Sequence, residues 1–237
     1  TRIIRASRYS AKLDFHLSNQ ALKQIKDTIN LWPWKWNIGD NADLAPSALS
    51  IRLRMELELL LENKYWKNAL KNLQACGGLG IVDSKLQNDP RLIERILIAK
   101  KSLIDPLTAL VYESKSPIYL ANRLHLNQQQ KEIIEGACRL NKYLKNIKAN
   151  NLYKNWSPSK WTIILEEINA NEYSFILEIC RENPLKEYLK SWLFNWKNIE
   201  SPIKGDDLIA KGWEAGPEIG IEIKRHRMKL IDEQNIF

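Results

Sequence analysis

Apolar side chains recur at intervals of three and four residues along almost the whole chain, which is the spacing of one face of an α-helix. In the first segment Ile3, Ile4, Ser7 and Ala11 share one broad face. After it, Ser18 offers a side-chain oxygen that can cap a second helix. The chain is therefore predicted to open with two amphipathic helices.

Further helices are indicated by their start signals. A proline directly after Asp, Ser or Asn is typical of the first turn of a helix, where its missing N–H would have no partner anyway. Such pairs occur at Asp89-Pro90, Asp105-Pro106, Ser116-Pro117, Ser157-Pro158 and Asn183-Pro184. Additional helices are predicted over residues 47–61, 65–76, 127–148, 206–211 and 217–230.

The third predicted helix begins at Ser47, which is expected to cap it. On its surface Arg52 can pair with Glu56, because side chains four residues apart meet on a helix. Arg54 and Glu58 have the same spacing, so a second ion pair is predicted beside the first.

The fold class follows from what is missing. No stretch alternates apolar and polar residues for long enough to define a sheet, and Gly80–Val82 is the single ambiguous segment. Pro33 breaks the Trp-rich stretch 32–36, which is expected to be a loop. We predict an all-α fold of many helices. Loop-like stretches at 83–88 and 149–157 suggest soft boundaries between residues 1–85, 86–150 and 151–237.

The composition is typical of a soluble globular protein with a basic excess. The 237 residues are 44% apolar and 27% charged, with a formal net charge of +8. No apolar run approaches the roughly 18 residues of a membrane span, and no secretory signal opens the chain. Cys76, Cys138 and Cys180 are far apart, which favours buried thiols in a reducing cytoplasm over a disulfide framework.

The basic residues are clustered. Residues 1–36 hold seven bases and two acids, and the stretch between Glu135 and Glu166 holds six bases and no acid. Clustered positive charge favours a polyanionic partner, with an ordinary solvated face as the equal alternative. The candidate RNA-binding residues of this stretch are Arg139, Lys142, Lys145 and Lys148, and the aromatic residues among them are Tyr143, Tyr153 and Trp156.

No catalytic or metal-binding pattern is present in the sequence. The chain has no Gly-x-Ser-x-Gly elbow, Walker loop or dinucleotide fingerprint, and its histidines lack zinc-site spacing. Asp206 and Asp207 come nearest to a two-metal carboxylate pair, but their place at a helix start favours capping of backbone N–H groups. We therefore predict no catalytic residue and no metal ligand in this chain.

Three segments resemble a known family. The chain opens with Arg2-Ile3-Ile4-Arg5-Ala6-Ser7-Arg8-Tyr9 and reaches Leu13-Asp14-Phe15. This resembles the Arg-x-x-Arg-Ala-x-Arg-Phe helix, ending in Leu-Gly-Phe, that follows a Glu-Asp-x-x-Arg motif in class II tRNA nucleotidyltransferases, the CCA-adding and poly(A) polymerase family. Arg52–Leu57 with Ala69–Gly77 resembles two helices of that family's neck, and 203–231 resembles its tail.

The resemblance implies roles for the first helix. Arg2 corresponds to the arginine of the Glu-Asp-x-x-Arg motif, which reads the incoming CTP or ATP as a protein template. Arg5 and Arg8 follow it as further nucleotide-binding residues. The Glu and Asp of the motif would lie upstream of Thr1, and Asp14 replaces the family's glycine.

The resemblance also implies a nucleic-acid contact in the tail. Gly212, Gly216 and Pro217 would form a turn whose free N–H groups could hold a phosphate. The predicted contacts to the tRNA backbone on the following helix are Lys224, Arg225 and Arg227. A packing motif between two helices is the equal alternative.

By this resemblance residues 1–85 form the neck, 86–150 the body and 151–237 the tail of a tRNA nucleotidyltransferase. Its partners would be the tRNA acceptor arm and, in the intact protein, CTP or ATP. Catalytic carboxylates and Mg²⁺ would belong to a head domain upstream of this fragment, which would bind tRNA without adding nucleotides. The alternative is a non-catalytic helical RNA-binding adaptor. The sequence carries no signal of oligomeric state.

Overall fold

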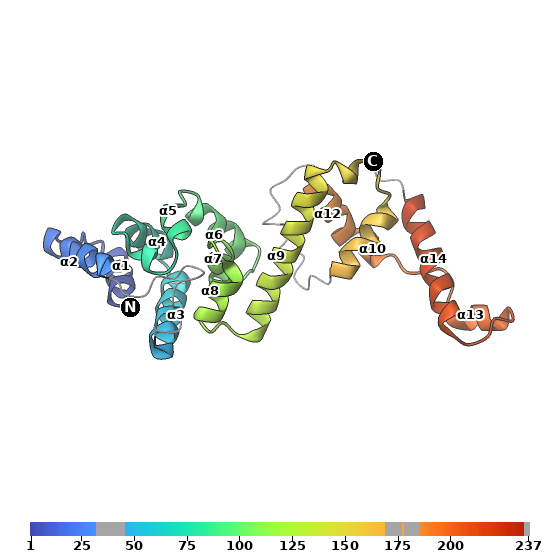
Figure 1. Cartoon of the computed structure of the whole chain (residues 1–237), viewed down its shortest axis with the longest axis horizontal. Coiled ribbons are helices and arrows are strands. Elements are labelled where there is room, and N and C mark those ends of the chain that lie inside the picture. Colours follow the sequence, from blue (N-terminus) through green and yellow to red (C-terminus); the bar gives the residue numbers. More distant parts are fainter. Residues whose placement is uncertain (32–45, 169–176, 178–184, 235–237) are drawn as a thin grey trace. The chain divides into compact units, whose positions relative to one another are not determined.

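The computed structural model describes residues 1–31, 46–168, 177 and 185–234, and all regular structure within them is helical (Figure 1). The all-α prediction is confirmed. The Trp-rich stretch 32–36, Cys180 and the predicted helix start at Asn183-Pro184 lie outside the described residues.

Two compact units divide the chain, unit 1 over residues 1–138 and unit 2 over residues 139–237. The helices of unit 1 are α1 (Arg2–Leu13), α2 (Asn19–Asn30), α3 (Ser47–Glu62), α4 (Trp66–Ala75), α5 (Ser84–Asn88), α6 (Leu92–Lys101), α7 (Pro106–Tyr112) and α8 (Pro117–Arg123). Helix α9 (Gln128–Ala149) begins in unit 1 and ends in unit 2. Unit 2 continues with α10 (Pro158–Ile168), α12 (Leu185–Phe194), α13 (Gly205–Ala210) and α14 (Pro217–Glu233). The finer division into neck, body and tail stays a prediction.

The core of unit 1 forms where α1 packs against α3 and α4. The apolar face that α3 and α4 turn inward is fully buried, and its largest members are Leu53, Leu57, Leu60, Leu70 and Leu73. Their spacing of three and four residues keeps them on one side of each helix. This packing holds the arginine-bearing helix α1 directly against α3.

Gly78 permits a close approach in this core. A Cβ at this position would lie 2.6 Å from side-chain atoms of both Ile3 and Leu73, nearer than packed carbon atoms allow. The preceding Gly77 has φ of 80° and follows the end of α4, the left-handed conformation in which glycine commonly ends a helix.

The segment that follows differs from the loop predicted for residues 83–88. The Asp83 carboxylate accepts hydrogen bonds from the backbone N–H groups of Lys85 and Leu86, at 2.9 and 3.0 Å. These bonds cap the short helix α5, because free N–H groups at a helix start need an acceptor. The ambiguous Gly80–Val82 overlaps a 3₁₀ turn, Gly78–Ile81, and is not a strand.

Two other predicted helix starts are shifted along the chain. Ser47 is the first residue of α3 and makes no side-chain cap, since Pro46 holds the cap position. Helix α6 begins at Leu92, two residues after Pro90. The start signals therefore locate these helices but miss their first residue.

Unit 2 has a tryptophan-rich centre. Trp161, Trp192 and Trp196 are almost completely buried, and the Trp161 ring stacks on Tyr188 with centroids 5.0 Å apart. Large aromatic rings bury more apolar area than any other side chains, so few helices suffice to enclose this core.

Helix α14 is fastened to α10 at two points. Asp232 accepts hydrogen bonds from the Ser159 backbone N–H at 2.8 Å and from the Ser159 hydroxyl at 2.7 Å. Arg227 pairs with Glu166 at 2.8 Å. Both anchors lie in the second half of α14, and its first half packs against α13.

Candidate nucleotide and RNA interface

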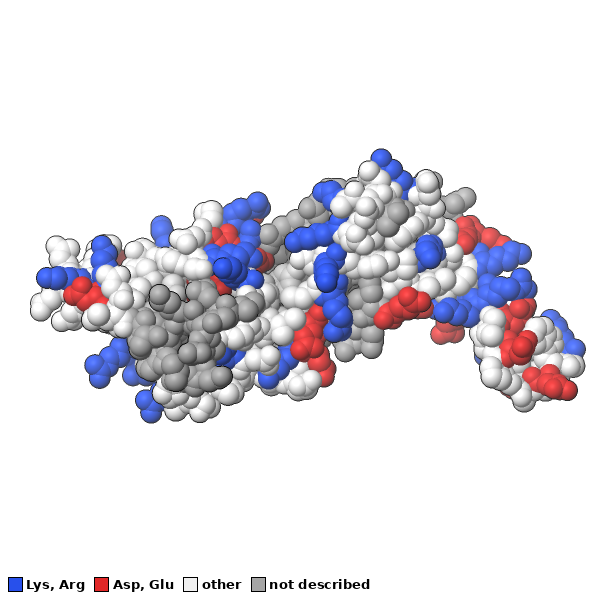
Figure 2. Space-filling model, viewed as in Figure 1, with Lys and Arg blue, Asp and Glu red and all other residues white. Residues whose placement is uncertain are grey.

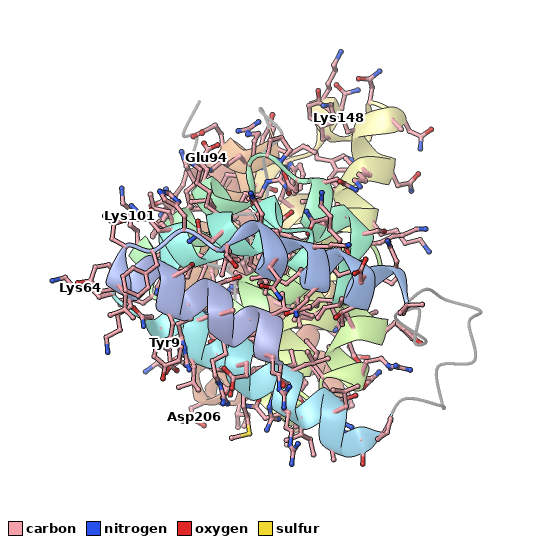
Figure 3. The ribbon with its side chains drawn as sticks, turned by 90° about the vertical axis from the view of Figure 1, so that its left-hand side faces the viewer. Tyr9, Lys64, Glu94, Lys101, Lys148 and Asp206 are labelled. Carbon is pink, nitrogen blue, oxygen red and sulfur yellow. The ribbon has the colours of Figure 1, made fainter. Side chains whose placement is uncertain are left out.

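The arginines of α1 converge on one carboxylate of α3. Arg5 donates two hydrogen bonds to Oε1 of Glu56, one of them from Nε at 3.0 Å. Arg8 approaches Oε2 of Glu56 at 3.5 Å. The Glu56 side chain is only 6% exposed, so two cations share this carboxylate at the buried junction of the two helices. Tyr9, the neighbour of Arg8, marks α1 in Figure 3.

This geometry overturns the predicted Arg52–Glu56 pair. Glu56 lies on the inner side of α3, between Leu53 and Leu57, and faces α1. Arg52 lies one turn earlier on α3, is exposed and has no ion pair with Glu56. The second predicted pair is confirmed, with Arg54 Nε 3.6 Å from Glu58.

The three arginines predicted to bind a nucleotide are held in different ways. Arg8 is 14% exposed and also lies over the Tyr9 ring, 5.5 Å from its centroid. Arg5 is 59% exposed in spite of its pairing, and the hydrogen bond with Glu56 raises the pKa of its guanidinium. Arg2 is exposed and forms no ion pair with any residue that the structure describes. A ligand can therefore reach Arg2 and Arg5, whereas Arg8 acts mainly inside the junction.

The end of α1 explains how Asp14 replaces a glycine. Asp14 has φ of 55°, and the Phe15 N–H bonds back to the Ser10 carbonyl at 2.9 Å. Asp tolerates this left-handed conformation better than most residues. The substitution thus preserves the helix end that a Leu-Gly-Phe sequence would form.

The basic residues of α9 form one exposed surface. Arg139, Lys142, Lys145 and Lys148 are all exposed, while Leu140, Leu144 and Ile147 between them are buried. Figure 2 shows basic side chains following this helix, with acidic ones near its beginning. We call Arg139, Lys142, Lys145 and Lys148 the α9 basic face. It can follow the phosphates of a nucleic acid.

The predicted basic residues of α14 do not form a comparable surface. Arg225 is paired with Glu222 in a two-pronged contact of 2.8 and 2.6 Å. Arg227 donates to the Ile199 carbonyl at 2.7 Å in addition to its pair with Glu166. Lys224 is exposed. Arg227 therefore ties α14 to its neighbours, and Lys224 is the residue most open to a ligand.

The tail turn has the predicted backbone but an acidic environment. Gly212 has φ of 90°, and the Trp213 N–H bonds to the Leu208 carbonyl at 3.1 Å, the pattern of a helix ended by a left-handed glycine. Gly216 is extended, and Pro217 occupies the first turn of α14. The acidic side chains around this turn are Asp206, Asp207, Glu214 and Glu218. A phosphate would be repelled by them.

The remaining candidates for chemistry are the Asp206-Asp207 pair and the cysteines, and the described contacts of Asp207, Cys76 and Cys138 lie within the fold. Asp207 accepts the Lys204 N–H at 2.8 Å, so the capping role predicted for the Asp206-Asp207 pair is confirmed for Asp207. Burial raises the pKa of the Cys138 thiol, and Cys76 is buried. Within the described residues no three His, Cys, Asp or Glu side chains gather as a metal site. In the same residues no helix has the length and apolar character to cross a bilayer.

Glu56 is the site residue for which the helix spacing predicted the wrong partner. A signal for the right one was present, because Glu56 occupies an otherwise leucine-rich helix face. A buried glutamate is rare unless it is paired, so its position on the inner face predicts a cationic partner from another helix. The identity of that helix, α1, could not be read from α3 alone.

Comparisons with known proteins identify the fold. No family model matches the chain, and no curated protein matches it. The solved structure of a tRNA-processing enzyme with CTP is 18% identical, with a TM-score of 0.62 over 98% of this chain and 62% of the other. A complex of a CCA-adding enzyme with ATP is also 18% identical, with a TM-score of 0.63 over 99% of this chain and 57% of the other.

A CCA-adding enzyme with CTP is 19% identical, with a TM-score of 0.61 over 98% of this chain and 55% of that chain. The chain thus has the fold of one part of these enzymes and spans about six tenths of their length.

Proposed function

We propose that this chain forms the tRNA-binding and nucleotide-reading portion of a tRNA nucleotidyltransferase, which adds CMP and AMP to the tRNA 3′ end. The observation that carries the proposal is the fold similarity to a CCA-adding enzyme with CTP, which runs through 98% of the chain. The arginine-bearing helix α1, at the start of that shared fold, supports it independently.

The nucleotide-reading role falls to Arg2 and Arg5. A guanidinium presents several N–H donors in a fixed plane and can pair with a base edge or a phosphate. Arg2 is exposed, and Arg5 keeps more than half of its surface accessible while Glu56 fixes its orientation. Arg8 and Glu56 brace this pair from inside the α1–α3 junction.

The RNA-binding role falls to the α9 basic face, with Lys224 as a second point of contact. Four exposed bases on one helix form an electrostatic footprint for a phosphate backbone. The tail turn around Gly212 is left out of this RNA surface because its charged side chains are mainly acidic.

Nucleotide addition would also require metal-binding carboxylates, which the residues assigned above do not supply. Mg²⁺, when bound by carboxylates of a further domain, would assist attack of the tRNA 3′-hydroxyl on the α-phosphate of CTP or ATP. The residues of this chain would hold the RNA and orient the nucleotide. By itself the chain is therefore expected to bind tRNA and to add no nucleotide.

The test is a titration of the purified chain with a tRNA minihelix and with single-stranded RNA of equal length, across a salt series. The proposal predicts tighter binding to the minihelix. Replacing Lys142 and Lys145 by Ala should weaken minihelix binding and lower the slope of log K against log salt by about one for each phosphate that is no longer neutralised.

The matched control is replacement of the exposed Lys67 and Lys71 of α4 by Ala, which removes the same charge from another helix. An equal decrease of affinity in both variants would reduce the RNA role to non-specific charge. Incorporation of CMP or AMP by the isolated chain would contradict the assigned division of labour.

A further inference from the structure

An apolar patch is exposed where α13 meets α14. We define the tail tip as residues 205–222, which include α13, the Gly212 turn and the first turns of α14. Its exposed large apolar side chains are Ile209, Trp213 and Ile221, and Ile221 is 67% exposed. Every residue from 209 to 218 is exposed. Clustered exposed apolar side chains rimmed by polar ones are typical of a protein contact surface.

The charge of the tail tip is opposite to that of the chain. It holds five acids and one base, whereas the whole chain carries +8. Asp206, Glu214 and Glu218 are exposed and form no ion pair with any described residue. This surface repels nucleic acid and favours a partner that combines positive charge with aromatic side chains.

The chain itself carries such a partner surface. Residues 136–165 hold six bases and no acid, and they include the α9 basic face. Partly exposed aromatic side chains lie in the same stretch, at Tyr143, Tyr153 and Trp156, and the rings of the last two also pack edge-on against Tyr188 and Trp161. The tail tip thus offers apolar side chains surrounded by acidic ones. The residue 136–165 surface offers aromatic side chains surrounded by basic ones, so the two surfaces are complementary.

The anchoring of α14 presents the tip away from α10. The Arg227–Glu166 and Asp232–Ser159 contacts fix the second half of this helix. Ten residues, about 15 Å of helix, separate Arg227 from Pro217. The tail tip therefore projects beyond these contacts, where another molecule can bind it.

We propose that the tail tip of one copy docks on the residue 136–165 surface of a second copy, forming a reciprocal dimer. Two such contacts, related by a twofold axis, close the assembly. The tip would then cover the bases assigned to RNA, so dimer formation and RNA binding would exclude each other. The dimer does not depend on the proposed function, and only the competition with RNA rests on it.

The experiment is sedimentation velocity of the full chain over about a hundredfold range of concentration at low and high salt, since weak contacts appear only at high concentration. We expect a concentration-dependent dimer at low salt that dissociates at high salt. The double variant W213S/I221S should weaken association about tenfold or more. F194S, which removes an exposed aromatic residue outside the tip, is the control and should leave association unchanged.

Reversing the charges on either of the two surfaces gives the most direct test of the contact. D206K/E218K and K142E/K145E should each be monomeric alone, and an equimolar mixture should associate again. A chain that stays monomeric throughout, or a dimer that tip variants do not affect, would overturn the proposal. So would a mixture that fails to restore association.

A tRNA minihelix should dissociate the dimer and bind the W213S/I221S variant at least as tightly as the unaltered chain. If the dimer forms as described but no minihelix selectivity is found, the self-association stands and the RNA function fails. If RNA binds selectively while the tip plays no part in association, the proposed RNA function stands and the proposed dimer fails.

Discussion

Glu56 shows how one residue connects the fold of unit 1 to its candidate site. Its carboxylate is buried, and its two nearest cations come from another helix, so it pins α1 to α3. The sequence predicts the helix and the charge of this residue, but helix spacing points to a surface pair with Arg52 and not to a buried position. It cannot predict the partner, because the contact joins residues 51 positions apart in the chain.

The change Glu56→Gln should destabilise unit 1 by about 2 kcal/mol. The substitution keeps the shape of the side chain but leaves Arg8, which is largely buried, without a counter-charge, and a broken buried pair costs more than an exposed one. Arg5 is more than half exposed, so solvent screening reduces the contribution of the Arg5–Glu56 pair to the free energy of unfolding. Urea unfolding followed by circular dichroism measures the effect.

The control for this prediction is Glu58→Gln on the same helix. Glu58 is 38% exposed and pairs with Arg54 at 3.6 Å, so its removal should cost less than about 1 kcal/mol. Equal destabilisation by the two substitutions would show that the Glu56 carboxylate has no special place in the junction. Nucleotide binding in a complete enzyme should fall for Glu56→Gln alone.

At the scale of the element, helix ends are the feature that the sequence predicts least well. The left-handed cap at Gly77 is predictable, because glycine signals it. The same conformation occurs at Asp14, Leu103 and His125, with φ between 51° and 58°. Nothing in a leucine indicates a left-handed residue, since only packing of the following segment enforces it.

Leu103 gives a stability prediction at this scale. It follows α6 with φ of 58°, and the Ile104 N–H bonds back to the Ala99 carbonyl at 2.9 Å. The side chain is 95% exposed and buries almost nothing. Leu103→Gly should therefore stabilise the chain by about 0.5–1 kcal/mol, because relief of the left-handed strain outweighs the added freedom of the unfolded chain. Urea unfolding measures the change.

Leu31→Gly is the matched control. Leu31 is also exposed after a helix end, at 80%, but its φ is −88°, so glycine offers no relief there and should destabilise by about 0.5–1 kcal/mol. Opposite signs for the two variants would assign the effect to backbone conformation. Destabilisation by Leu103→Gly as well would contradict the strain argument.

On the scale of the whole molecule, the all-α class and most helix positions follow from the sequence because periodicity and start signals are local. The division into two units does not follow. It falls between Cys138 and Arg139, inside the long helix α9, where no loop marks it. A boundary of this kind depends on which residues α9 packs against on each side, and those contacts are non-local.

Helix α9 therefore belongs to two cores at once. Ile134 and Ala137 are fully buried in unit 1, and Leu140 and Leu144 are buried in unit 2. Melting the helix in either unit withdraws support from the other through the continuous backbone. We expect the unaltered chain to show one thermal transition in differential scanning calorimetry.

The substitution Arg139→Pro should split that transition into two. Proline removes one backbone hydrogen bond and breaks a helix interior at a cost of about 3 kcal/mol, while the exposed Arg139 side chain contributes to neither core. Each unit would keep its own buried residues, while the helical backbone between them would be interrupted. Arg139→Ala preserves the helix and removes the same charge, so it should keep a single transition. Two transitions in the unaltered chain, or one in the proline variant, would mean that α9 does not couple the unfolding of the two units.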